Sequence, residues 1–211
     1  HLCEPKYTHH NFGPRVCYIF IYFFLRIKSI LMKPINAIAA VCENMGIGID
    51  NRIPWRLRNE LKYFSRKTSK TKLEGKKNAV IMGRRVWQEI SKKLPNRVNV
   101  IVSTILDDPH IEDVFVCSSF PEALNLLNTN PLSESIETIW AIGGTRIYEE
   151  TMNHPECNRL YITRILKNFE CDTFYPEIDA SKFKLVSDPD VPEEIQEENG
   201  ISFKYEVYEK Q

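Results

Sequence analysis

An acid stands among apolar residues in the segment IPWRLRNELKYF (53–64), which follows a long loop. Leu57, Leu61 and Phe64 recur at the spacing of one buried helix face, and Glu60 falls on that same face. A glutamate there can bend into solvent at the margin of the face, or it can favour the helix dipole from the first turn. It can also recognise a ligand, and the spacing alone leaves these alternatives open.

A second candidate site is the segment WAIGGTRIY, in which a predicted strand runs through Gly143-Gly144 into a helix. Two glycines let backbone amides approach a phosphate closely, and a helix N-terminus favours negative charge. A tight turn that needs positive φ explains the same glycines equally simply. The dinucleotide fingerprint G-x-G-x-x-G is absent, which excludes the usual Rossmann phosphate loop.

Two arginines open the helix predicted in MGRRVW, directly after Gly83. Cations at a helix start oppose the dipole, so Arg84 and Arg85 cost some stability unless an anion compensates. A bound phosphate would do so, since arginine supplies forked hydrogen bonds. A pair of solvated arginines is the alternative.

Two further features fit ligand binding. The loop NMGIGIDNRIPW (44–55) has the length and glycines of a mobile lid, and its Ile47 and Ile53 could cover a flat ligand. Arg97 begins a predicted buried strand and could clamp a carboxylate bidentately. The simpler alternatives are isoleucines packed on the domain and an arginine that solvates the strand end.

The elements that must position these residues alternate between strand and helix from residue 34 onward. Such alternation predicts an α/β fold with a mostly parallel central sheet flanked by helices, and ligand sites at the carboxyl ends of its strands. The tail segments KFKLVSD and ISFKYEVYE alternate around EENG, which predicts a closing C-terminal antiparallel hairpin. The predicted strands are 35–42, 78–83, 97–103, 113–119, 136–144 and 159–165, with helices after 55, 83, 119 and 144.

Composition narrows the function. Lysine plus arginine and aspartate plus glutamate number 28 each, so the net charge of zero argues against a bulk nucleic-acid binder. The six cysteines form no C-x-x-C pair, which argues against a zinc site and favours free thiols in a reducing compartment such as the cytoplasm. We therefore expect no metal, no nucleic acid and no membrane partner.

The first 33 residues differ from the remainder. The apolar run Val16–Leu25 is too short to span a bilayer as a helix, which needs about 20 residues. The regular pattern begins after Met32, the first methionine, so residues 1–33 are expected to be an extension outside the fold and 34–211 the domain. A membrane-surface anchor is the rival interpretation, and the sequence leaves it open.

Taken together and in order, five segments resemble dihydrofolate reductase in its animal-type, monofunctional form. They are NAIAAVCENMGIG, IPWRLRNELKYF, NAVIMGRRVW, IWAIGGTRIYEE and DTFYPEI, and the resemblance covers about residues 34–209. It implies a monomeric enzyme that transfers hydride from NADPH to C6 of 7,8-dihydrofolate, with a proton added at N5. The tetrahydrofolate formed supplies one-carbon metabolism, and antifolates inhibit such enzymes.

The resemblance also assigns roles to residues. Glu60 would hold the pteridine through two parallel hydrogen bonds, Thr163 would be its partner, and Trp55 would help hold an ordered water. Arg97 would bind the glutamate α-carboxylate. The substrate pocket implied by the resemblance comprises Ile38, Glu60, Leu61, Phe64, Ile90, Leu94, Arg97 and Thr163.

For the cofactor, the resemblance implies a nicotinamide contact, a lid and a phosphate cradle with a cis Gly143–Gly144 peptide. The implied residues are Ala40, Ile47, Gly48, Gly83, Arg84, Arg85, Val86, Ser103, Thr104, Gly143, Gly144, Thr145, Arg146, Ile147 and Tyr148. Two of these positions depart from the family pattern: Val86 replaces a threonine and Thr104 replaces a basic residue. Ser118, in the region implied to face the adenine, replaces another basic residue. The preference for NADPH over NADH is therefore expected to depend mainly on Arg85.

Two other functions fit parts of the sequence. A reductase of a riboflavin-pathway pyrimidine shares the fold but would not need Glu60 on the apolar face of its helix. A non-catalytic pteridine- or nucleotide-binding module would not need an intact acid, lid and cofactor cradle together.

Overall fold

The computed structural model describes residues 33–211; residues 1–32, which contain the apolar run Val16–Leu25, lie outside the described residues. No helix in the described part is long and apolar enough to cross a membrane. In chain order the elements are β1 (Ile35–Val41), β2 (Gly46–Gly48), α2 (Arg58–Ser69), β3 (Lys77–Gly83), α3 (Arg84–Ile90), β4 (Arg97–Val102), β5 (Val114–Cys117), α4 (Phe120–Leu127), α5 (Leu132–Ser135), β6 (Ile136–Ala141), α6 (Thr145–Asn153), β7 (Cys157–Ile165), β8 (Thr173–Phe174), β9 (Phe183–Val186), β10 (Gln196–Glu198) and β11 (Ile201–Lys210).

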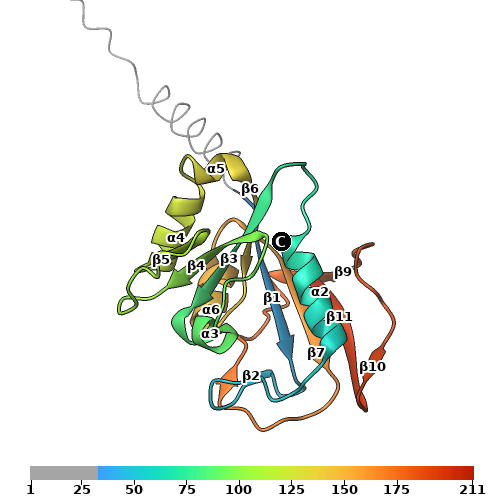
Figure 1. The fold of residues 1–211 in the computed structure, drawn as a ribbon. Helices are drawn as coiled ribbons and strands as arrows, with labels where there is room; N and C mark the ends of the chain where they lie inside the picture. Colours follow the sequence, from blue (N-terminus) through green and yellow to red (C-terminus); the bar gives the residue numbers. More distant parts are fainter. Residues whose placement is uncertain (1–32) are drawn as a thin grey trace, which may run out of the picture. The chain divides into compact units, whose positions relative to one another are not determined.

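A central sheet organises residues 33–211, with the strand order β10-β11-β7-β1-β6-β3-β4-β5 and β9 added beside β11. Five neighbouring strand pairs are parallel: β1–β6, β1–β7, β3–β6, β3–β4 and β4–β5. Strand β11 is antiparallel to β7. The predicted mostly parallel sheet with an antiparallel C-terminal part is confirmed. The carboxyl ends of β1, β3, β4 and β6 therefore share one edge, and β2 lies beyond the end of β1 (Figure 1).

Helices cover both faces of this sheet. On β3, Val80 and Met82 pack in one apolar cluster with Tyr63 of α2, while Ile81 packs in another with Ile147 of α6. Successive strand residues point to opposite faces, so α2 and α6 lie on opposite sides. Because both faces are covered, β1, β3 and β4 are almost continuously buried instead of alternating.

The predicted buried stripe on the first helix is wrong. Leu57 is buried but precedes α2, and Leu61 on the helix is 52% exposed. The helix buries Glu60, Tyr63 and Thr68 instead, so its inward face is largely polar. The acid faces inward as predicted and Phe64 is partly buried, but Leu61 does not share that face.

The closing hairpin also differs in detail from the prediction. The turn at Asn199-Gly200 joins the short β10 to β11, with Glu198 opposite Ile201. The KFKLVSD segment contributes β9, which pairs with the far end of the same edge of β11. The sequence alternation identified the strands correctly, but the tail holds three strands and not two.

Candidate active site

Glu60 is buried near the start of α2, with only 7% of its surface exposed. The hydroxyl of Thr163, fully buried on β7, donates a hydrogen bond of 3.2 Å to Glu60 Oε1. Thr163 lies between Ala40 of β1 and Tyr205 of β11 in the sheet register, which fixes its position. The structure thus brings together two of the three residues predicted to be catalytic.

The carboxyl of Glu60 has a perturbed pKa. Burial raises its pKa from 4.5 to about 7, and the hydrogen bond from Thr163 opposes that rise. The negative charge of Glu60 in turn contributes to raising the pKa of the buried phenol of Tyr148, after the larger effect of burial. A carboxyl that titrates near neutral pH in a buried site is typical of functional positions.

No cation pairs with Glu60 among residues 33–211. The described ion pairs of this part of the chain lie elsewhere, and a threonine hydroxyl uses only one of about four acceptor positions of a carboxylate. A buried charge without a partner is costly, so a ligand with N–H donors would stabilise the ionised form of Glu60. That Glu60 has no cationic partner is seen in the contacts of the structure; the spacing of residues in the sequence did not show it.

Trp55 is buried nearby in the sequence but belongs to a different cluster. Its ring lies 5.3 Å from the ring of Phe169, and it packs with Leu57, Ile165 and Phe203. No direct hydrogen bond joins Trp55 to Glu60 in the described part of the chain. Any shared role with Glu60 would therefore require a bridging water.

A buried arginine lies at the other end of α2. Arg97 is 2% exposed; its Nε donates to Pro95 O at 2.9 Å and its Nη1 donates to Thr68 Oγ1 at 2.6 Å. Asn99 shapes the preceding turn by bonding both the amide and the carbonyl of Leu94. No carboxylate pairs with this guanidinium within residues 33–211, and burial lowers its pKa.

Sequence reasoning missed Thr68, Asn99 and Asn78, which support this end of the site. Asn78 of β3 donates to the carbonyls of Thr68 and Lys70, and so ties the end of α2 to the sheet. The only signal in the sequence was an asparagine near the start of each of two apolar strands, at Asn78 and Asn99. An asparagine at such a position has many explanations, so it did not predict these contacts.

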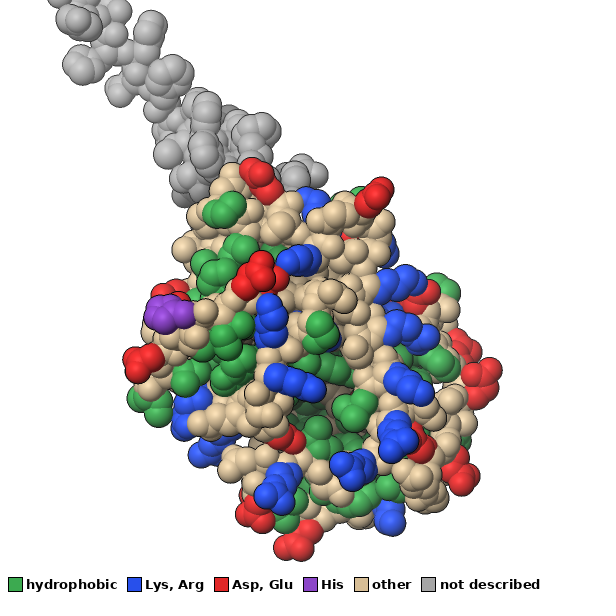
Figure 2. Space-filling model, viewed as in Figure 1, with side chains coloured by type: hydrophobic (Ala, Val, Ile, Leu, Met, Phe, Trp, Pro, Cys, Tyr) green, Lys and Arg blue, Asp and Glu red, His purple; other side chains and the backbone are tan. Residues whose placement is uncertain are grey.

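Apolar side chains connect the two ends. Of the predicted substrate-pocket residues, Ile38 is buried, and Phe64, Ile90 and Leu94 pack partly buried against the same cluster. Leu61 stands apart from that cluster and is exposed. Figure 2 shows a recess with hydrophobic side chains at its base and Lys and Arg side chains around its rim.

Gly143, the first residue of the glycine pair that follows β6, has a geometry that only glycine allows. Gly143 has φ +107°, and a Cβ there would lie 3.0 Å from the phenol oxygen of Tyr148. Its carbonyl accepts a 2.7 Å bond from Gly83 N, and the Gly143–Gly144 peptide is cis, as the resemblance implied. Tyr148 OH donates to Ile38 O at 3.0 Å, so the pair positions this phenol under β1.

The start of α6 offers free backbone donors. Gly144 precedes the helix without a side-chain cap, and the first turn carries no acid. The carbonyl of Gly144 accepts from Ile147 N and Tyr148 N, whereas the amides of Thr145 and Arg146 have no backbone acceptor in the described region. A Cβ on Gly144 would meet nothing within 4 Å, so the space beside these amides is open.

Three side chains predicted to bind the cofactor, at the start of α6, already make contacts within the chain. Thr145 Oγ1 donates to Phe174 O at 2.7 Å, Arg146 forms an ion pair with Glu150 at 2.9 Å, and Ile147 lies in the apolar core. The side chain of Ile147 is thus buried in the core beside Gly83, and its contact with a cofactor stays a prediction.

The remaining cofactor candidates lie at the same edge of the sheet. Gly83 ends β3, and the half-buried Arg84 and the exposed Arg85 follow it; neither arginine pairs with an acid in the described part. Ser103 Oγ accepts from the amides of Ile105 and Leu106, which closes its own turn after β4. Val86 is half-buried and Thr104 is exposed.

The predicted lid is docked on β8. The β2 strand pairs Gly46 with Phe174 and Gly48 with Thr173, and Asp172 Oδ2 accepts from Asp50 N at 3.0 Å. Ile47 packs against the core and Ala40 lies partly buried at the end of β1. The loop is therefore held against β8, beyond the carboxyl end of β1 (Figure 1).

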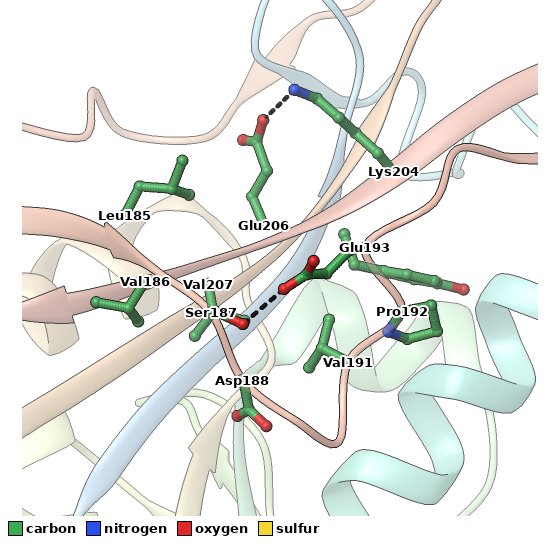
Figure 3. Close-up of a pocket in the computed structure, with 11 residues that line it drawn as sticks. Leu185, Val186, Ser187, Asp188, Val191, Pro192, Glu193, Lys204, Glu206 and Val207 are labelled. Carbon is green, nitrogen blue, oxygen red and sulfur yellow. Dashed lines mark hydrogen bonds and ion pairs between the residues drawn. The ribbon is translucent and has the colours of Figure 1, made fainter.

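A separate pocket of about 360 Å³ lies between β9 and β11, away from this edge (Figure 3). Its polar side chains satisfy one another: Ser187 donates to Glu193 at 2.6 Å, and Lys204 pairs with Glu206 at 2.8 Å. It offers no comparable unpaired buried charge, so the candidate site is the one built around Glu60 and Arg97.

Comparisons with known proteins agree with this geometry. A family model described as dihydrofolate reductase matches residues 34–210. The dihydrofolate reductase of Aedes albopictus is 49% identical over 187 residues, covering 85% of this chain and 98% of the relative. That of Rattus norvegicus is 46% identical over 185 residues, covering 85% and 99%. A solved structure, Schistosoma mansoni dihydrofolate reductase, is similar with a TM-score of 0.76 at 36% identity, covering 85% of this chain and 100% of that chain.

Proposed function

Because the chain belongs to the dihydrofolate reductase family, and so reduces dihydrofolate to tetrahydrofolate with a nicotinamide cofactor, we propose how its residues divide that work. The observation that carries the proposal concerns the two ends of α2: within residues 33–211, a buried acid has no cation at one end and a buried cation has no acid at the other. A substrate with nitrogen donors at one end and a carboxylate at the other would satisfy both.

Glu60 holds the pterin ring in this proposal. Its two oxygens accept from two parallel N–H donors of the ring, while the Thr163 hydroxyl retains its own bond to Oε1. Hydrogen bonds to the charged form lower the pKa of a carboxyl, so the pterin would counteract the rise caused by burial. Glu60 orients the ring and biases protonation at N5 through water near Trp55.

Arg97 binds the carboxylate of the glutamate tail. Its Nε and Nη1 are held by Pro95 and Thr68, which orients the fork before substrate arrives. Between the two ends, Ile38, Phe64, Ile90 and Leu94 line the path of the ring system, and the exposed Leu61 closes it from α2. The exposed side chain of Leu61 is available for contact with a ligand.

We propose that the nicotinamide cofactor is NADPH. The open space beside Gly144 and the uncommitted amides of Thr145 and Arg146 fit a pyrophosphate, and Gly83 lies against the same turn. Arg84 and Arg85, without acid partners in the described part, suit the additional 2′-phosphate. Ser103 and Thr104 would flank the adenosine, and Ala40, Ile47, Gly48 and Tyr148 the nicotinamide.

When bound, the cofactor supplies a hydride, which is chemistry that no side chain here provides. The chain's own residues bind and orient: Glu60 and Arg97 place the substrate, and the docked loop around Ile47 excludes water from the edge of the sheet. Tyr148, held by Ile38 O, forms part of the floor beneath the site.

We further propose that residues 34–211 act as a monomer in the cytoplasm. The support for a monomer is that both recognition groups and the cradle come from one chain. The support for a reducing compartment is that Cys42, Cys117, Cys157 and Cys171 are free thiols.

An absorbance assay of NADPH oxidation with dihydrofolate, combined with titration of methotrexate, tests the proposal. We expect turnover that depends on dihydrofolate, runs faster with NADPH than with NADH, and stops when methotrexate occupies the site. Binding of methotrexate without turnover would support a non-catalytic pteridine module instead. Turnover of a riboflavin-pathway pyrimidine in place of dihydrofolate would overturn the proposal.

A further inference from the structure

Two cysteines face each other where the predicted lid leaves the sheet. Cys42 follows the last residue of β1 and is fully buried, and Cys171 lies just before β8 and is partly exposed. Their Sγ atoms are 3.9 Å apart although 129 residues separate them in the chain. The contact joins the root of the loop to the segment on which the loop docks.

Gly46 of the loop lies directly on this pair of thiols. A Cβ at Gly46 would stand 2.4 Å from Cys171 Sγ and 3.0 Å from Cys42 Sγ. The carbonyl of Gly46 also accepts from Cys42 N at 3.0 Å and from Cys42 Sγ at 3.4 Å. The absence of a side chain here lets the two sulfurs approach each other.

The segment that begins with Cys171 holds the loop in its docked position. The next residue, Asp172, donates its amide to Gly48 O at 3.0 Å and accepts from Asp50 N through its carboxylate. A covalent bond between the two cysteines would therefore join both sides of the loop's docking contact.

We propose that Cys42 and Cys171 are a redox modification site, which a hydroperoxide closes to a reversible disulfide that keeps the loop 43–53 docked. This inference goes beyond the assignment of substrate and cofactor, because bond formation between the sulfurs requires neither. The sulfur–sulfur distance must shorten by just under 2 Å, from the 3.9 Å contact to a bond of about 2.05 Å.

The reaction proceeds in two balanced steps. The partly exposed Cys171 attacks the peroxide as thiolate, so that the O–O bond breaks, a sulfenic acid forms and hydroxide leaves. The thiolate of Cys42 then attacks the Cys171 sulfur and displaces a second hydroxide. Two thiols are oxidised, one peroxide is reduced, and the protons released by the thiols convert both hydroxides to water. A small dithiol reductant reverses the bond by exchange.

The buried surroundings of Cys171 make its oxidation by peroxide slow at neutral pH. Burial, followed by the contact with Cys42, raises the pKa of the Cys171 thiol to about 11, and thiolate is the reactive form. Oxidation should therefore accelerate with rising pH up to that value.

Peptide mass spectrometry of the full chain after mild hydrogen peroxide treatment tests the bond. Cys3 and Cys17 should first be replaced by serine, so that only the four described cysteines remain. We expect a peptide linked through Cys42 and Cys171 that disappears with dithiothreitol. Cys171→Ser should abolish the link, and the matched control Cys117→Ser, a buried cysteine on β5, should retain it.

Hydrogen exchange tests the effect on the loop without reference to catalysis. The amides of Asp50 and Asp172 make the docking bonds, so their exchange should slow about tenfold in the oxidised chain. Turnover should fall by about fivefold or more, because lid opening limits product release in many enzymes whose lid covers the site. The proposal is overturned if Cys42 and Cys171 remain thiols after peroxide treatment. It is also overturned if the amides of Asp50 and Asp172 exchange as fast in the disulfide-linked chain as in the chain with free thiols.

Discussion

Arg97 donates a hydrogen bond of 2.6 Å to the hydroxyl of Thr68, a residue on the same helix that carries Glu60. Eight residues separate Thr68 from Glu60, which corresponds to about 12 Å along a helix axis. The distance between the acid that would hold the pterin and the arginine that would hold the tail is therefore set largely by the rise of α2. A shift of that helix would misplace both ends together.

Thr68→Val should weaken binding of the substrate's tail. The change removes the acceptor that orients Arg97, so we expect the KM for dihydrofolate to rise about tenfold, the range for hydrogen bonds to charged groups. The kcat should change little. A dihydropterin without the glutamate tail should show no change in KM, and Thr68→Ser, which keeps the hydroxyl, should behave like the parent chain. Equal losses for both substrates would contradict the role given to Arg97.

Glu60→Gln should fold but lose most of its turnover. Glutamine cannot accept two parallel hydrogen bonds or carry the charge that biases protonation, so we expect a loss of about a hundredfold or more near neutral pH. The loss should be smaller in acid, because a substrate that is already protonated needs less help. Steady-state kinetics across the pH range measure this. Full activity of the variant near pH 7 would refute the assignment.

The same substitution should stabilise the fold at neutral pH. The native pKa of Glu60 is about 7 against an ordinary 4.5, so the folded chain binds this proton more tightly than the unfolded chain. Stability is therefore lost as pH rises from 4.5 to 7, and the full cost above that window is about 3 kcal/mol. Glutamine stays neutral, so Glu60→Gln should exceed the parent in urea unfolding above pH 7 and match it below pH 4.5.

Glu198→Gln is a control for the urea unfolding experiment, because its effect on stability should be opposite to that of Glu60→Gln. The carboxylate of Glu198 accepts from Asn59 N and Arg58 N at 2.8 Å each, and these bonds lower its pKa. Its substitution should destabilise the chain at neutral pH, with the effect fading in acid. An increase in stability there would show that the carboxylate does not cap α2.

Arg85→Ala should reduce the preference for NADPH over NADH. The resemblance to the family implies that Thr104 and Ser118 replace basic residues, so Arg85 would carry most of the interaction with the proposed 2′-phosphate. We expect the KM for NADPH to rise about tenfold or more while that for NADH changes little, as for loss of one charge-assisted contact. Lys184→Ala, on the distant β9, serves as the matched control. Parallel losses for both cofactors would show that Arg85 does not contact this phosphate.

The order and type of the main elements could be predicted from the sequence because they depend on local patterns. The buried runs of β1, β3 and β4, the turn residues of Asn199-Gly200 and the serine cap before α4 are each visible within a few residues. The short β2 and β8 were missed, since they exist only by pairing with each other across the chain.

The buried face of α2 could not be predicted in the same way. Its pattern favoured Leu61, but tertiary packing turned Tyr63 onto the sheet, where its ring stacks on Tyr205 at 4.0 Å, and left Leu61 exposed. A helix in contact with a ligand pocket has polar residues inside and apolar ones at the opening. Periodicity assumes the reverse, and this is why it failed here.

The sequence by itself determined which chemical groups this protein possesses and the local segments that carry them: an acid after Pro54-Trp55, a glycine pair before a helix, and arginines at strand ends. Only the tertiary structure decided their partners. Thr163 meets Glu60 across 103 residues, and Arg97 meets Thr68 across 29, because the sheet register and the docking of α2 bring distant segments together. Burial, which gives these groups their unusual pKa values, is a property of that packing and of no single segment.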